Sequence, residues 1–269
     1  PDARVALTLR LLGGLGTPEI AKAFLVPEAT VAQRIVRAKR KIEAANIPYR
    51  VPAAADLPER LGTVLAVLYL VFNEGYFATT GDSLVRTDLS GEAIRLTRVL
   101  AGLMPDEPEV HGLLALMLLT ESRRPARTDA EGAPVLLADQ DRDLWDHALI
   151  GEGQAIVRAL VRRNLPGPYQ VQAAIAAVHA DAARAEHTDW NRIVASYDLL
   201  VRLAPNDVVR LNRAIAVAER DGAAAGLALV DSLTGLDTDG PYHVAVAELT
   251  RRTGDTDRAR DAYRRALDL

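Results

Sequence analysis

Residues 15–34 of this 269-residue chain read LGTPEIAKAFLVPEATVAQR, and this stretch decides the fold of the N-terminal part. Thr17-Pro18 predicts a helix start, because a capping hydroxyl precedes a proline at the first helical position. The short helix that follows should end near Phe24. A tight turn then leads into a long helix, which we expect over residues 28–45. The pattern indicates a helix-turn-helix unit.

The apolar residues of this stretch predict that both helices pack on one core. Ile20 gives the first helix an inward stripe, and Ala21 is small enough to let the second helix cross closely. Val31 and Ile35 place the apolar side of the second helix on the same core. Its N-terminal side chains are then left facing outward, and this end of such a helix enters the major groove of DNA. The candidate DNA-binding residues are Glu28, Ala29, Thr30, Gln33, Arg34, Arg37 and Lys41.

The chemistry of these side chains suits both bases and phosphates. Gln33 could donate to and accept from adenine, and Arg34 could bridge guanine O6 and N7 or bind a phosphate. A dense positive run follows, and its members cannot all face one way on a helix. Only some can therefore reach DNA, mainly as phosphate contacts. The run comprises Arg37, Lys39, Arg40 and Lys41.

The composition indicates an all-α protein with room for two domains. The chain is 49% hydrophobic and 4% aromatic, and it shows no run of alternating β-branched and aromatic residues. It contains no cysteine, which excludes disulfides and thiolate metal sites and fits a cytoplasmic protein. The longest apolar run, residues 61–72, is shorter than the roughly 20 residues that span a bilayer, so we expect no membrane segment.

Charge is distributed unevenly along the chain. Residues 1–50 hold nine Lys and Arg against four Asp and Glu, a net +5, so the remainder carries −9 of the total of −4. A basic head on an acidic body suggests that one end alone meets a polyanion. The chain begins Pro1-Asp2 without an initiator Met, and we interpret it as an internal fragment of a longer protein.

The helix pattern predicts four segments: the helix-turn-helix at 1–46, a proline-containing linker at 47–57, a helical extension at 58–168 and repeats at 169–269. The extension should hold helices at 58–77, 90–104, 108–122 and 140–163, with a long surface loop at 123–139. The repeats should be helix pairs at 169–186 with 189–203, 207–220 with 223–234, and 241–253 with 255–268.

Turn positions recur in the last segment at Asp189, Gly222 and Asp255, at intervals of 33 residues. A period near 34 built from helix pairs is the tetratricopeptide signature. An irregular helical array with accidental spacing is the alternative. Within the first of these repeats, Trp190, Ile193 and Tyr197 share one helix face and should be core, which leaves Asp198 as the candidate partner-binding surface residue.

Residues 3–45 resemble region 4 of the extracytoplasmic-function sigma factors. The matching strings are Leu15-Gly16-Thr17-Pro18-Glu19-Ile20-Ala21, Thr30-Val31-Ala32-Gln33-Arg34 and Arg37-Ala38-Lys39. Leu25 and Pro27 depart from the Gly and Ser that are usual in the family's turn. The resemblance implies recognition of the promoter −35 element by the second helix and contact with the β-subunit flap of RNA polymerase. Sigma region 2 is absent from this sequence.

The remainder resembles the subgroup of these sigma factors with a C-terminal extension that ends in tetratricopeptide-like repeats. The matching strings include Phe72-Asn73-Glu74-Gly75-Tyr76, Ser122-Arg123-Arg124-Pro125-Ala126-Arg127 and Asp139-Gln140-Asp141-Arg142. Helical repeats stack into curved arrays whose concave side suits an extended partner, so we expect a regulatory or protein-interaction role for this part. The acidic body could also contact the basic N-terminal domain through electrostatic attraction. A repeat-protein scaffold and a non-sigma regulator that binds operators as a dimer remain alternatives.

Other polar clusters favour structural roles. Glu74, Glu92, Arg95 and their neighbours Asn73, Arg86 and Asp88 could line a polar pocket, but a buried ion-pair network is the simpler interpretation. Asp139, Asp141 and Asp143 imitate the start of a calcium loop, yet Leu144 and Ile150 stand where that loop needs Gly and Glu. No histidine pair or catalytic fingerprint is present, so we expect neither a metal site, nor a cofactor, nor enzymatic activity.

Overall fold

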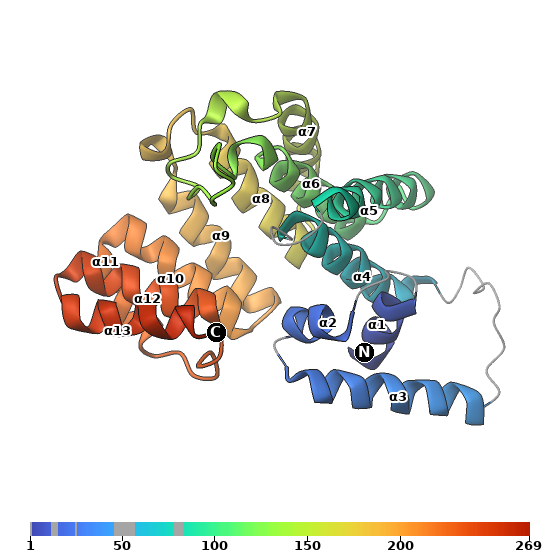
Figure 1. Cartoon of the computed structure of the whole chain (residues 1–269). Helices are drawn as coiled ribbons and strands as arrows, with labels where there is room; N and C mark the ends of the chain where they lie inside the picture. The colour runs from blue at the N-terminus through green and yellow to red at the C-terminus, as the bar shows by residue number, and fades with distance from the viewer. Residues whose placement is uncertain (1, 12–15, 25, 46–56, 78–82) are drawn as a thin grey trace. The chain divides into compact units, whose positions relative to one another are not determined.

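The fold of the protein is all-α, as predicted (Figure 1). The computed structural model describes residues 2–11, 16–24, 26–45, 57–77 and 83–269. In these ranges the only β pairing is one isolated bridge between Thr128 and Pro134. The helices are α1 (Asp2–Leu11), α2 (Thr17–Ala23), α3 (Glu28–Ala44), α4 (Leu57–Phe77), α5 (Ser83–Leu103), α6 (Pro108–Glu121), α7 (His147–Arg163), α8 (Pro168–Asp181), α9 (Trp190–Leu203), α10 (Asp207–Asp221), α11 (Ala223–Val230), α12 (Gly240–Thr253) and α13 (Thr256–Leu267).

The chain divides into two compact units, residues 1–105 and residues 106–269. The segment boundaries expected at 46, 57 and 168 stay a prediction. Most of the expected linker lies outside the described residues, as does Leu25. Within the described ranges, every helix is too short or too polar to cross a bilayer.

The first unit is built around a core shared by α1, α2 and α3. Leu9, Ile20 and Val31 are fully buried in it, one from each helix. Helix α4 adds partly buried aliphatic side chains to this cluster and packs against α1, and α5 packs along α4. The helix-turn-helix segment therefore does not stand alone, because the apolar side of α4 extends its core. The α4 residues involved are Ala66, Val67, Leu70 and Val71.

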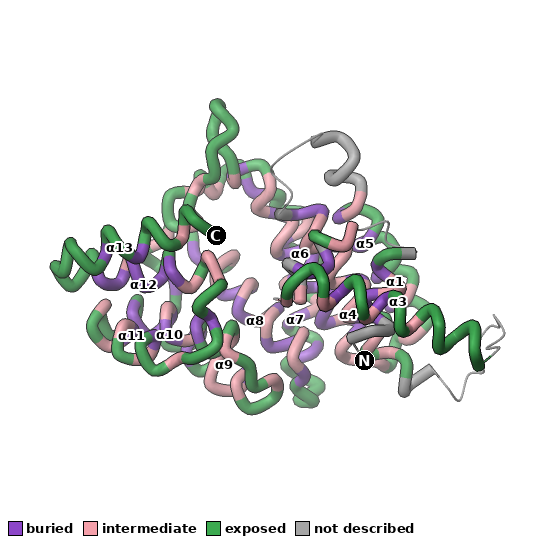
Figure 2. The backbone as a smooth tube through the Cα atoms, turned by 60° about the horizontal axis from the view of Figure 1, so that its bottom comes forward, coloured by how far each residue is buried: buried purple, intermediate pink, exposed green. Residues whose placement is uncertain are grey.

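The second unit is a chain of helices in which neighbours in sequence pack together. Helix α6 is buried at every position from Gly112 to Leu119 and packs on both α7 and α8. The later helices follow as contacting pairs, α8 with α9, α10 with α11, and α12 with α13. Figure 2 shows that α13 keeps a mostly exposed outer side.

The turns predicted at 33-residue intervals are confirmed. Asp189 caps α9 by accepting from the Arg192 backbone N–H at 3.0 Å, and Asp255 caps α13 through Arg258 at 3.1 Å. Gly222 joins α10 to α11 with a φ of 100°, which side-chain-bearing residues rarely adopt. The repeating turns thus use local capping chemistry that the sequence already displays.

Several helix ends differ from the predicted ones. Helix α7 begins at His147 rather than at 140, because Asp146 accepts from the backbone N–H groups of Ala148 and Leu149 and starts the helix there. Helix α8 ends at Asp181 rather than 186, helix α11 ends at Val230 rather than 234, and α5 already begins at Ser83 rather than at 90. The long loop consequently spans residues 122–146, with short 3-10 turns at Arg124–Ala126 and Arg142–Leu144.

The prediction of a buried ion-pair network is wrong for Glu92 and Arg95, the pair that the structure describes. Glu92 and Arg95 form two hydrogen bonds of 2.7 Å, but both side chains are exposed on α5, one turn apart. The side chains of Arg86 and Asp88 lie outside the described residues. In the loop, Asp141 accepts from the Asp143 backbone N–H at 3.0 Å and so caps a 3-10 turn.

Candidate nucleic-acid interface

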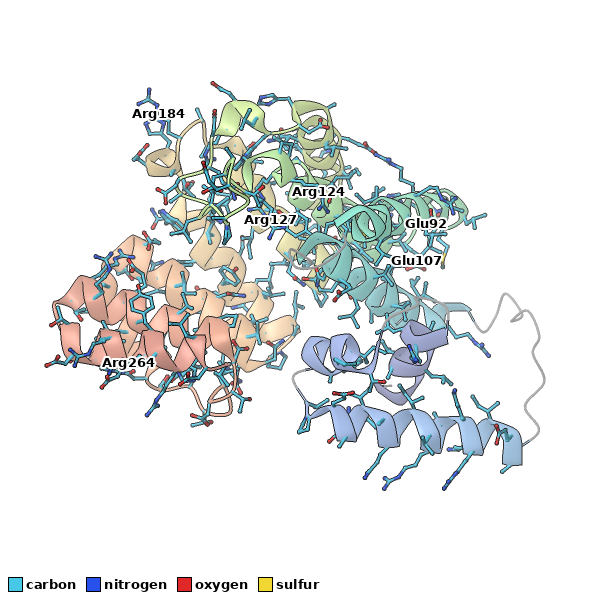
Figure 3. All side chains as sticks on the ribbon, in the orientation of Figure 1. Glu92, Glu107, Arg124, Arg127, Arg184 and Arg264 are labelled. Carbon is cyan, nitrogen blue, oxygen red and sulfur yellow. The ribbon has the colours of Figure 1, made fainter. Side chains whose placement is uncertain are left out.

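Helix α3 is held by its apolar side and presents the rest of its surface outward. Val31 is 1% exposed and Ile35 7% exposed, and both pack in the core of the first unit with Ile20 and Ala21. Nearly every other α3 position is exposed or half-exposed (Figure 2). Figure 3 shows the nitrogen-tipped side chains of α3 projecting away from α1 and α2. Two core residues therefore orient the whole helix.

The turn between α2 and α3 is short and internally bonded. The Val26 backbone N–H donates to the Ala21 carbonyl at 3.1 Å, and Val26 packs against the core. Pro27 has a φ of −57° and no side-chain cap, but its carbonyl accepts from the Thr30 N–H at 2.9 Å. Pro27 thus starts α3 through its backbone, although it cannot supply the hydroxyl cap of the usual serine.

The outer face of α3 carries Gln33, Arg37 and Arg40. At about 100° per residue, these three side chains fall within about 60° of arc, while Val31 and Ile35 lie about 160° away from Gln33 on either side. All three are exposed. The side chain of Gln33 lies near the start of the helix, and the two guanidinium groups follow it toward the end. The amide of Gln33 could bind a base edge while Arg37 and Arg40 bind two phosphates.

The remaining predicted residues divide between this face and its flanks. Ala29 lies on the outer face, about 40° from Gln33, whereas Thr30, Arg34 and Lys41 follow one flank, about 60° to 100° from it. Arg34 is half-buried and already engaged in an interaction within the protein. The exposed carboxylate of Glu28 lies elsewhere, about 140° from Gln33 on the side toward Ile35. The structure therefore does not bring Glu28 to the outer face.

Sequence reasoning missed Arg40 as a site residue. It stands in the positive run, but the run alone does not tell which members share a face. The angle around the helix from Gln33 shows which members share its face, because Arg40 lies about 20° from Gln33 and Lys39 about 120°. Helix α3 as a whole holds five Lys and Arg against two Glu, a net +3, which attracts a polyanion.

The candidate partner residue of the second unit, Asp198, is already paired. Its Oδ1 accepts from Arg213 Nε at 2.6 Å, which links α9 to α10, and its side chain is 43% exposed. Ile193 is fully buried, and Trp190 and Tyr197 pack against the same cluster, as their spacing predicts. Asp198 as a partner surface stays a prediction, and any partner would have to share its carboxylate with Arg213.

Comparison with known proteins adds an independent line of evidence. Residues 1–42 match the family described as Sigma-70, region 4, and residues 60–161 match a family of unknown function (DUF6596). "Uncharacterized protein R00370" of Rhizobium meliloti (strain 1021) is 50% identical over 268 residues, which cover 99% of this chain and 63% of that protein. The chain thus spans less than two thirds of this relative's length. No solved structure matches the chain. Together, the matches at residues 1–42 and 60–161 support a sigma-70 family sigma factor.

Proposed function

We propose that this chain contains region 4 of an extracytoplasmic-function sigma factor and that α3 recognises the promoter −35 element. The observation that carries the proposal is the outer face of α3. Gln33, Arg37 and Arg40 lie opposite the buried Val31 and Ile35, within a segment that matches sigma-70 region 4. A helix anchored in this way can enter a major groove without disturbing its core.

The flanks of α3 support a defined orientation in the groove. One flank carries Arg34 and Lys41, whereas the opposite flank carries Lys39 beside Glu43, whose charges offset each other. Phosphates attract the first flank more strongly than the second. In the proposed complex, Gln33 reads a base edge, Arg37 and Arg40 reach the phosphates along the groove, and the Arg34 flank follows one strand.

The proposal extends to the partners and location that the family resemblance implies. RNA polymerase would engage the first unit through the β-subunit flap, in the cytoplasm, and sigma region 2 would lie in a part of the protein outside this chain. Residues 169–269 of the second unit would form tetratricopeptide-like repeats with a regulatory or protein-binding role. Its consecutive contacting helix pairs and its turns at 33-residue intervals support that assignment. No enzymatic activity and no cofactor form part of the proposal.

Selection of duplexes from a random DNA pool by the purified chain tests the proposed function. We expect one short, asymmetric motif to be enriched, and Gln33→Ala should relax the base preference at one position of it while Lys39→Ala leaves the motif unchanged. Two inverted half-sites about 10 base pairs apart would instead indicate a dimeric regulator. Absence of any enriched motif would favour the scaffold and overturn the proposal.

A further inference from the structure

The second unit contains a cavity of about 410 Å³ between the long loop and the helices α8, α9 and α10. This volume falls in the range of small-molecule sites, roughly 300 to 1,000 Å³. Four parts of the unit that are distant in sequence contribute to it. The lining residues used below are Leu136 and Arg142 from the loop, His179 from α8, Trp190 and Ile193 from α9, and Glu219 from α10.

The loop wall of this cavity is fixed to the end of α8. Arg142 Nη1 donates to the carbonyl oxygens of His179 and Ala182, both at 2.6 Å, and its guanidinium lies 4.7 Å from the ring centre of the buried Trp145. One side chain thus satisfies two carbonyl groups at a helix end and stacks on an aromatic ring. The wall is therefore present before any ligand binds.

The interior surface of the cavity is mainly apolar and aromatic. Ile193 is fully buried and forms part of the floor, and the rings of His179 and Trp190 meet edge to face at 5.4 Å. Burial and the nearby Arg123 and Arg142 lower the pKa of His179 to about 4, so this ring is uncharged at neutral pH. The aromatic wall consequently offers stacking surface rather than charge.

The charged groups at the cavity are already committed to protein partners. Arg142 bonds the two carbonyl groups of α8, and Glu219 forms an ion pair with Arg252 of α12. The two charges have opposite signs, and the ring of His179 is uncharged at neutral pH, so the lining carries no net charge. An ion that entered the cavity would find no net opposite charge to offset its lost hydration, whereas an uncharged ligand would need none.

One apolar side chain at the rim supports the same conclusion. Leu136 is 74% exposed although it belongs to the loop that forms the wall. The preceding residue is tied to the start of the loop, since the Val135 N–H donates to the Arg127 carbonyl at 2.7 Å. A ligand that fills the cavity would cover this leucine and remove its apolar surface from water.

We propose that this cavity binds an uncharged, mainly apolar small molecule, which stacks on Trp190 and covers Leu136. The site is separate from promoter recognition, which uses the first unit, so either proposal can fail without the other. A ligand here would join the long loop to three helices of the second unit.

Tryptophan fluorescence tests the site directly. The chain has two tryptophans, so Trp145→Phe leaves Trp190 as the reporter at the cavity. Titration of this variant with the neutral dye N-phenyl-1-naphthylamine should quench Trp190 and saturate. The anionic 8-anilino-1-naphthalenesulfonate should bind more weakly. Tighter binding of the anionic dye, or quenching that never saturates, would overturn the proposal.

A matched pair of leucines locates the bound dye. Leu136→Asp should weaken the binding at least about tenfold, because it removes an apolar contact and adds a charge at the rim. Leu165→Asp makes the same change at a leucine that is 60% exposed and borders a different groove, between α7 and α9, so the affinity should stay unchanged. An equal loss in both variants, or a loss only in the second, would place the dye elsewhere.

Two further measurements keep the outcome clear. Thermal unfolding of each variant shows whether the second unit stays folded. If Leu136→Asp unfolds, Asn212→Asp replaces it, because Asn212 also lines the cavity and is exposed, so the variant adds the same charge. Quenching of Trp190 by purified RNA polymerase core but not by the neutral dye would mean that a protein docks here and would contradict a small-molecule site.

Discussion

The sharpest test of the α3 interface compares two neighbouring cations, Arg37 and Lys39. Both are exposed and each carries one positive charge, so Arg37→Ala and Lys39→Ala change the net charge of the chain equally. They differ in direction, since Arg37 lies about 40° from Gln33 around the helix and Lys39 about 120°. Only the Arg37 side chain should therefore reach a phosphate when Gln33 faces the bases.

The magnitude follows from the release of counterions. Each phosphate contact contributes about 0.9 to the slope of log affinity against log salt, so Arg37→Ala should lower the slope by about 0.9. Between about 50 and 200 mM salt, this difference corresponds to a roughly 3.5-fold smaller loss of affinity in the variant. Arg37→Ala combined with Arg40→Ala should lower the slope by about 1.8, whereas Lys39→Ala should leave it close to that of the unchanged chain.

Fluorescence anisotropy with a labelled duplex that carries the selected motif, measured over a salt series, gives these slopes. A scrambled duplex of the same length should show the same decrease for Arg37→Ala, because a phosphate contact carries no sequence information. Equal slopes for Arg37→Ala and Lys39→Ala would refute the assignment of the outer face. A loss confined to the selected duplex would make Arg37 a base-reading residue instead.

Four further predictions follow from particular contacts. Gln33→Ala in the full-length factor should weaken −35 recognition by about 1–3 kcal/mol, whereas Arg34→Ala, on the flank that follows the phosphates, should weaken binding to all duplexes alike. Unchanged transcription from the cognate promoter would remove either residue from the site. Deletion of the C-terminal repeats should abolish transcription while α1–α3 stay folded. The deletion should start at Asp106 rather than at residue 169, because α6 packs on α8 and would otherwise lose that contact. Higher activity of the shortened factor would mark the deleted part as an inhibitory domain. Gly226→Ala should lower the free energy of unfolding by about 1–3 kcal/mol, since its Cβ would lie 2.4 Å from the Cβ of Ala218, whereas Gly151→Ala, with open space around it, should raise this energy by up to about 1 kcal/mol in urea titrations. The second unit should lose stability as the pH falls from 6.5 toward 4, by at most about 3 kcal/mol, because the unfolded chain protonates His179 first; urea titrations of His179→Gln should show a flatter pH dependence.

Local patterns in the sequence were enough to predict most helices and their turns. The apolar positions Ile20, Val31 and Ile35 predict the core that orients α3, and the structure buries all three. Asp189 and Asp255 indicate helix starts because each side chain accepts a hydrogen bond from a backbone N–H only three residues away. Such interactions act within one helical turn, so their signal survives in the sequence alone.

The fine geometry of the candidate interface needed one more step. The positive run of α3 predicts contact with a polyanion, and the burial of Val31 and Ile35 confirms which side of the helix is free. That observation adds Arg40 to the outer face and places Glu28 away from it. The sequence contains the angles around the helix and predicts its inward side, and the structure confirms that side.

Contacts between distant residues decided what the sequence could not show. Arg142 bonds the carbonyl of His179, 37 residues away, and thereby joins the long loop to the end of α8. Glu109 accepts from the backbone N–H groups of Tyr169 and Gln170, some 60 residues away, and thereby fixes the start of α8 beside α6. The cavity and the low pKa of His179 arise from this packing. Helices and turns follow from interactions between near neighbours, which the sequence of this protein displays, whereas a cavity depends on which surfaces meet in space, and only the folded chain determines that.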